Sequence, residues 1–137
     1  MFMTDVAVRW SDMDVYGHVN NARVVTLLEE ARTELLFNEG AKRGAETLAE
    51  GVVVVELRVR YLQPLAYSAR PVRVRLWVSE LRAASFALDY VVAGAGGDAV
   101  SARTQLAPYD IGAQRPRRLM PAEREFLAAF RNHGDDG

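Results

Sequence analysis

One long helical segment dominates the pattern of this sequence and limits the folds that it can adopt. From Asn21 to Asn38 the apolar residues recur three and four positions apart, as on one face of an α-helix. Asn20 or Asn21 suits its N-cap and Gly40 its end, so at about 1.5 Å per residue the helix is roughly 27 Å long. This helix must bury an apolar stripe against another element, and the stripe consists of Val24, Leu27, Leu28, Ala31 and Leu35.

Most of the remaining chain has the alternating pattern of β-strands. Residues 5–10 predict a first strand that ends near Trp10, and residues 52–111 predict four consecutive antiparallel strands with a hairpin turn at 94–98. Residues 121–131 predict a short C-terminal helix, followed by a frayed tail over 132–137. An antiparallel sheet wrapped around the long helix is the simplest way to bury its stripe. We therefore expect an α+β fold in a single domain, residues 1–137.

The composition argues against several classes of protein. With 17 basic and 18 acidic residues the net charge is −1, so no overall charge attracts nucleic acid or anionic membranes. The sequence has no cysteine, which excludes disulfides, thiolate nucleophiles and cysteine metal sites. The N-terminus lacks a signal-peptide pattern, and the longest apolar run, 52–55, is too short to cross a bilayer. We expect a cytoplasmic protein with no nucleic-acid or membrane partner.

A polar loop before the helix holds the residues best suited to chemistry. Between Arg9 and Asn21 stand two aspartates, a glycine, a histidine and two asparagines. Unpaired N–H groups and the positive dipole end of a helix N-terminus stabilise anions and polarised carbonyl oxygens. Asp14 is a candidate catalytic carboxylate, although an aspartate here can also serve only to cap the turn. Asp12 should point to the other face, and two acids alone are a poor metal site, so we expect no metal.

The same loop carries a resemblance to a known family. Residues Asp14–Ala22 (DVYGHVNNA), followed by Leu28–Arg32 (LEEAR) and Arg60–Pro64 (RYLQP), resemble the hotdog-fold acyl-CoA thioesterases. The sequence is most similar to the 4-hydroxybenzoyl-CoA thioesterase family and to the bacterial long-chain acyl-CoA thioesterases. The resemblance implies a helix wrapped by an antiparallel sheet, a homodimer or homotetramer formed through the sheets, and active sites at the interface between subunits.

The resemblance also implies roles for individual residues. Asp14 corresponds to the family's catalytic aspartate, and the backbone N–H that polarises the thioester carbonyl would be that of Asn21. The 4-hydroxybenzoyl-CoA enzymes differ at His18, whereas plant thioesterases that act on acyl carrier protein share the Asp…His-Val-Asn-Asn run but have asparagine in place of Tyr16. His18 either orients water, donates to the carbonyl or holds Asp14, or it is a loop histidine satisfied by the backbone. Glu30 either lies on a solvated face or is held near the site by a second subunit.

A basic loop near the C-terminus is the candidate site for the phosphates of coenzyme A. Its arginines either meet these phosphates or lie on a solvated loop, and they are Arg115, Arg117 and Arg118. We expect no metal or organic cofactor, because a thiol leaving group with a pKa near 8.5 needs little acid assistance.

The function expected is hydrolysis of an acyl-CoA, or of an acyl group on a carrier protein, to a carboxylic acid and the free thiol. Asp14 acts either as the base for water or as the nucleophile. One alternative is an enoyl-thioester hydratase or dehydratase of the same fold, which resembles an Asp-x-Asn-Pro-x-His pattern. The spacing between Asp14 and His18 is one residue shorter and lacks the proline. The other alternative is a hotdog protein that binds acyl thioesters without catalysis.

Overall fold

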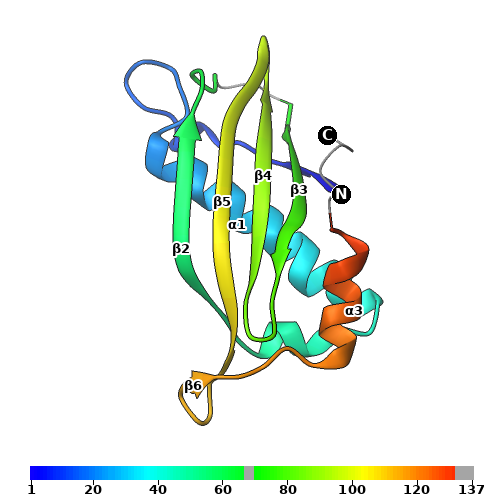
Figure 1. Cartoon of the computed structure of the whole chain (residues 1–137). Helices are drawn as coiled ribbons and strands as arrows, with labels where there is room; N and C mark the ends of the chain where they lie inside the picture. The colour runs from blue at the N-terminus through cyan, green and yellow to red at the C-terminus, as the bar shows by residue number, and fades with distance from the viewer. Residues whose placement is uncertain (67–69, 132–137) are drawn as a thin grey trace.

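A curled antiparallel sheet packs against one central helix in a computed structural model, which describes residues 1–66 and 70–131 (Figure 1). The strands follow the order β1-β3-β4-β5-β2, and a short β6 pairs with the end of β5. All pairings between these strands are antiparallel. The strands are β1 (Phe2–Val6), β2 (Val52–Tyr61), β3 (Val72–Leu81), β4 (Phe86–Gly94), β5 (Gly97–Asp110) and β6 (Arg115–Pro116). This arrangement confirms the predicted α+β class with four consecutive strands after the helix.

The central helix runs further than the sequence predicts. It begins as α1 (Asn21–Thr33), continues through a π-helical stretch (Glu34–Glu39) and ends as α2 (Gly40–Lys42). Gly40 was expected to end the helix, but its φ of −58° is helical. An ideal Cβ on this buried residue would lie 3.7 Å from the ring of Phe126, so the position favours a small residue for packing. The chain leaves the helix at Gly44, whose φ is +83°.

The helix and the sheet share one hydrophobic core. The predicted apolar stripe of α1 is buried, as are the alternate residues of β3 and β4 that face it. The period-two burial along β3 and β4 shows that one sheet face meets the helix and the other faces away. The core residues on these two strands are Val74, Leu76, Val78, Phe86, Leu88, Tyr90 and Val92.

The ends of the chain differ from the prediction in detail. The first strand ends at Val6 rather than near Trp10, because Trp10–Asp12 forms a 3₁₀ turn closed by the Asp12 carboxylate. A second 3₁₀ helix, Glu46–Glu50, precedes β2. The C-terminal helix α3 (Pro121–Ala129) ends two residues early, and the predicted tail at 132–137 lies outside the described residues.

Strand β2 forms an edge of the sheet with apolar side chains exposed. It pairs only with β5 within the described residues, and a bulge interrupts the register between Val54 and Glu56. Its exposed apolar residues are Val53, Val54, Val55, Leu57 and Tyr61. No helix in the described part of the chain is long and apolar enough to cross a membrane.

Candidate active site

The loop between the 3₁₀ turn and α1 is built around the Asp14 carboxylate. Its Oδ1 accepts hydrogen bonds from the backbone N–H of Tyr16, at 2.8 Å, and of His18, at 3.2 Å. The Asp14 N–H donates to the His18 carbonyl at 2.8 Å, and Gly17 supports the turn with a φ of +77°. Within residues 1–66 and 70–131, Oδ2 of Asp14 accepts no hydrogen bond. One oxygen therefore organises the turn and the other is left for chemistry.

The start of α1 leaves one N–H group open beside this carboxylate. Asn20 caps the helix, since its side-chain oxygen accepts from the Ala22 N–H at 2.9 Å. The Arg23 and Val24 N–H groups bond to the Asn20 carbonyl, at 2.9 and 3.1 Å. The N–H of Asn21 donates no hydrogen bond to any residue in the described part of the chain. It is thus a donor at the positive end of the helix dipole, available for a ligand oxygen.

Asp14, His18 and Asn21 line a single cleft of about 300 Å³. The opposite wall comes from the end of β2 and the segment after it, including Tyr61 and Leu65. Leu65 fixes this wall to the loop, because its carbonyl accepts the Val19 N–H at 2.7 Å. The structure therefore brings together three of the four predicted catalytic residues.

Tyr61 is a site residue to which the sequence assigned no role. Its hydroxyl donates to the Asn21 carbonyl at 2.8 Å and so ties the first turn of α1 to the end of β2. The residue is 47% exposed and lines the cleft. In the sequence, only its place in the RYLQP segment points to a role for Tyr61. The hydrogen bond itself could not be predicted, because it joins residues 40 positions apart.

Asp12 stabilises the loop through hydrogen bonds to residues on either side of it. Its buried carboxylate accepts from the Arg9 N–H at 2.9 Å and from the Arg9 guanidinium at 3.3 Å. These bonds, the backbone bond foremost, hold the pKa of Asp12 below its usual range although burial opposes the shift. The Asn20 N–H donates to the Asp12 carbonyl at 2.8 Å. Asp12 is therefore a structural residue, and its carboxylate does not line the Asp14 cleft.

Comparison of the chain with known proteins shows to which protein family it belongs. The model of the thioesterase-like superfamily matches residues 8–130. The chain belongs to the thioesterase-like superfamily. A solved thioesterase from Thermus thermophilus, complexed with coenzyme A and Zn, is 27% identical with a TM-score of 0.76, over 93% of this chain and 92% of that one. The probable thioesterase YbaW of Escherichia coli is 28% identical with a TM-score of 0.75, over 96% and 100% of the two chains.

A curated relative gives a shorter match. The long-chain acyl-CoA thioesterase FadM of Escherichia coli (strain K12) is 38% identical over 65 residues, and the chain matches about half of that relative's length, 49%. A predicted thioesterase from Bacillus stearothermophilus shares the fold, with a TM-score of 0.82 at 20% identity over 96% of both chains. The sheet wrapped around one helix and these superfamily structures confirm the predicted hotdog fold.

Glu30, the fourth predicted catalytic residue, lies away from the cleft of this thioesterase-like chain. It stands nine residues beyond Asn21 on α1, which is about 14 Å along the helix axis. It is exposed and borders a shallow groove with Thr26, Glu29 and Glu34. One subunit does not bring Glu30 to Asp14, so its catalytic role stays a prediction that depends on a second subunit.

The predicted phosphate-binding arginines lie far from the cleft within one subunit. Arg115 pairs with Asp110 at one end of β5, whereas Val100, near the other end, lines the cleft. The ten residues that separate Val100 from Asp110 span roughly 30 Å. Arg115 and Arg118 are exposed and keep their predicted role only if another subunit brings them to the site.

Arg117 makes structural hydrogen bonds within the chain. Its guanidinium donates to both carboxylate oxygens of Glu123, each at 2.8 Å, and to the Thr47 carbonyl at 3.3 Å. The Arg117 side chain is only 19% exposed, and the Glu123 side chain is fully buried. The hydrogen bond to Glu123 raises the pKa of Arg117. The sequence did not predict this pairing with the helix that follows, and phosphate binding by Arg117 stays a prediction.

Proposed function

We propose that this protein is an acyl-CoA thioesterase that hydrolyses its substrate to a carboxylic acid and coenzyme A. The observation that carries the proposal is that Asp14 and the open N–H of Asn21 line one cleft at the N-terminus of α1. Membership of the thioesterase-like superfamily supports the reaction class. The names of FadM and of the Thermus complex support coenzyme A as the thiol.

The chemistry assigns separate tasks to the two groups. The Asn21 N–H and the α1 dipole stabilise the negative charge that develops on the thioester oxygen. Oδ2 of Asp14 either takes a proton from an attacking water or attacks the carbonyl itself, and in both routes the carbon–sulfur bond breaks with the thiolate leaving. Oδ1 stays bonded to the N–H groups of Tyr16 and His18, so the carboxylate is held in one orientation.

His18 is proposed as an assisting residue. The residue lines the cleft together with Asp14, and its backbone N–H is already bonded to that carboxylate. A neutral imidazole there can accept a proton from water or donate to the thioester oxygen. The alternative is that His18 serves only as part of the turn.

We propose a homodimer formed through β2. An edge strand with unpaired backbone groups and exposed valines is a template for pairing with another strand. The exposed side chains of Val54, Val55 and Leu57 supply apolar surface along this edge. A second copy would pair antiparallel across β2 and place its own β6 end near the first copy's cleft. Arg115 and Arg118 of that copy would then approach the substrate.

The test is release of free thiol from a panel of acyl-CoAs. Wild type should hydrolyse at least one substrate, and Asp14→Asn should lower kcat/KM by roughly a hundredfold or more, as for loss of a general base. Asp5→Asn is the matched control, because Asp5 is exposed on β1 and pairs with Arg73, away from the cleft. Full activity in Asp14→Asn would disprove the role of Asp14. Binding of acyl-CoA without turnover in wild type would favour the non-catalytic alternative.

A further inference from the structure

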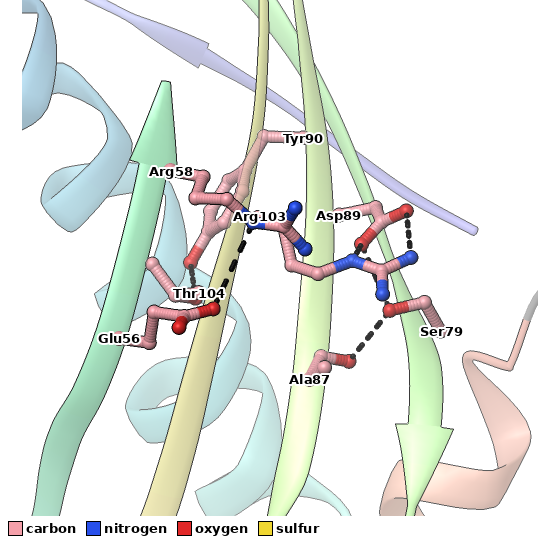
Figure 2. Close-up of polar contacts among 8 residues, drawn as sticks. All are labelled: Glu56, Arg58, Ser79, Ala87, Asp89, Tyr90, Arg103 and Thr104. Atoms are coloured by element: carbon pink, nitrogen blue, oxygen red, sulfur yellow. Dashed lines mark hydrogen bonds and ion pairs between the residues drawn. The ribbon is translucent and has the colours of Figure 1, made fainter. Parts of the chain in front are cut away.

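A second hollow lies on the face of the sheet that points away from α1. It has a volume of about 460 Å³ and is open to solvent across β2, β5, β4 and β3. Tyr90 and Thr104, which share a buried 2.7 Å hydrogen bond, point to the opposite, helix-facing side (Figure 2). The side chains that define the hollow are Arg58, Arg60, Trp77, Asp89, Ser101 and Arg103.

One wall of the hollow is already neutralised. Arg103 donates to both oxygens of Asp89, at 2.7 and 3.1 Å, and the Ser79 hydroxyl donates to the same carboxylate at 2.8 Å. Figure 2 shows this chain of contacts running from β5 over β4 to β3. The bond to Asp89 raises the pKa of Arg103. Asp89 is therefore committed to Arg103 and does not balance other charges in the hollow.

The other wall carries positive charge without a firm partner. Arg58 stands directly opposite Arg103 in the β2–β5 register, an arrangement that destabilises a sheet. Its acidic partner, Glu56, is 3.7 Å away, and the two side chains are 69% and 60% exposed, so this pair contributes little. Arg60, two residues along the same face, has no carboxylate within 4.0 Å among the described residues. Opposite it lies the small Ser101, which leaves room above the sheet.

We propose that this hollow is a second binding site, specific for a nucleoside phosphate. Arg58 and Arg60 would hold the phosphate, since guanidinium groups bind phosphate oxygens in pairs. Trp77, half-buried on β3, would stack against the base, and Ser101 lies opposite Arg60 on β5. The volume falls in the range of small-molecule sites. The site goes beyond the proposed hydrolysis, because it lies on the opposite face of β2 from the Asp14 cleft.

The ligand can come from two sources. A free nucleotide would make the hollow a separate effector site. Alternatively, the nucleotide end of coenzyme A could reach it around the end of β2, because Arg60 immediately precedes Tyr61 of the cleft. A second copy of this chain is a different occupant, but a symmetric contact across this face would bring the same arginines against each other.

Binding of ADP can be followed through Trp77 fluorescence in a Trp10→Phe background, which removes the only other tryptophan. We expect a saturable change with ADP that weakens as salt is added. The paired change Arg58→Gln with Arg60→Gln should raise the Kd by about tenfold or more. The matched control, Arg73→Gln with Arg82→Gln, removes two exposed arginines, on β3 and in the turn after it, that already have acidic partners, and it should leave the Kd unchanged.

Several results would overturn the proposal. The first is the absence of an ADP-dependent signal at millimolar ADP, and the second is an unchanged Kd in the Arg58/Arg60 variant. The third is a changed molecular mass in that variant when wild type binds no ADP, which would indicate a contact between copies. Because binding is measured without turnover, the result does not depend on the proposed hydrolysis.

Thiol-release assays with added ADP distinguish the two sources of the nucleotide. If ADP raises KM for acyl-CoA and leaves kcat unchanged, the site holds the nucleotide end of the substrate. If ADP binds and KM is unchanged, the site is upheld as one for a free nucleotide.

Discussion

At the residue scale, two side chains from distant parts of the sequence set the geometry of the cleft. Asp14 is fixed by its own loop, through the N–H groups of Tyr16 and His18. The Asn21 peptide group is fixed from the other side, because the Tyr61 hydroxyl donates to its carbonyl. The distance between carboxylate and open N–H therefore depends on both contacts, and Tyr61 positions the oxyanion donor without having to touch substrate.

Tyr61→Phe should lower kcat by roughly threefold to tenfold with little change in KM. The expected size is that of one hydrogen bond, about 0.5–1.5 kcal/mol, lost from the alignment of the Asn21 N–H. Steady-state kinetics on an acyl-CoA substrate measures both constants, and a melting curve shows whether the fold is retained. Tyr90→Phe, which removes a buried hydroxyl that bonds to Thr104 and does not line the Asp14 cleft, is the control and should leave kcat as in wild type. Equal losses in the two variants would exclude a positioning role for Tyr61.

At the element scale, a buried ion pair joins α3 to the loop after β6, and a further hydrogen bond joins it to the 3₁₀ helix Glu46–Glu50. Glu123 is the third residue of α3, and its carboxylate accepts from Arg117, from the Met120 N–H at 2.8 Å and from the Thr47 hydroxyl at 2.7 Å. Burial opposes the charge on Glu123, but these hydrogen bonds outweigh it and keep its pKa below the usual range. A group with a lowered folded-state pKa stabilises the fold above its unfolded pKa and loses that effect as the pH falls.

Glu123→Gln should therefore destabilise the protein most at neutral pH. At pH 7 the loss should be about 3 kcal/mol, because the half-buried Arg117 loses its counter-charge. The difference from wild type should shrink as the pH falls below the usual glutamate pKa of about 4.3 and wild type takes up the proton in turn. Urea unfolding at several pH values measures this, with the exposed Glu125→Gln on the same helix as control. A difference independent of pH would mean that Glu123 acts only through packing.

At the scale of the whole molecule, the exposed edge of β2 is the place where a second copy would pair to complete the active site. The bulge places Val55 between Val54 and Glu56 with no partner residue on β5. Proline is accepted at bulges, yet it removes an N–H that a neighbouring strand would need. A substitution at Val55 can therefore block pairing with a second copy while the pairing of β2 with β5 is kept.

Val55→Pro should convert the proposed dimer to a monomer while the fold is retained. Light scattering gives the mass and circular dichroism the strand content, and Val55→Thr keeps the β-branched shape as a control. If the monomeric variant also loses thiol release, this would support active sites that need the second subunit. A wild-type monomer at micromolar concentration, or an unchanged mass in the proline variant, would contradict the dimer.

Features that depend on near neighbours in the chain could be predicted from the sequence. The apolar stripe of α1, its Asn20 cap and the strands after residue 52 follow from spacings of two to four residues. The turn around the Asp14 carboxylate is equally local, because the hydrogen bonds to that carboxylate link residues at most four apart. These parts were predictable because side chain and backbone preferences act over the same short range.

Which distant residues meet depends on the three-dimensional fold. Arg117 donates to the Thr47 carbonyl, Tyr61 donates to the Asn21 carbonyl, and Phe126 lies beside Gly40 of the central helix. The outer hollow arises from the register of four strands, which sets Arg58 opposite Arg103. Such contacts join residues far apart in the chain, and their energies depend on burial and on register. Neither quantity is fixed until the whole sheet has closed around the helix.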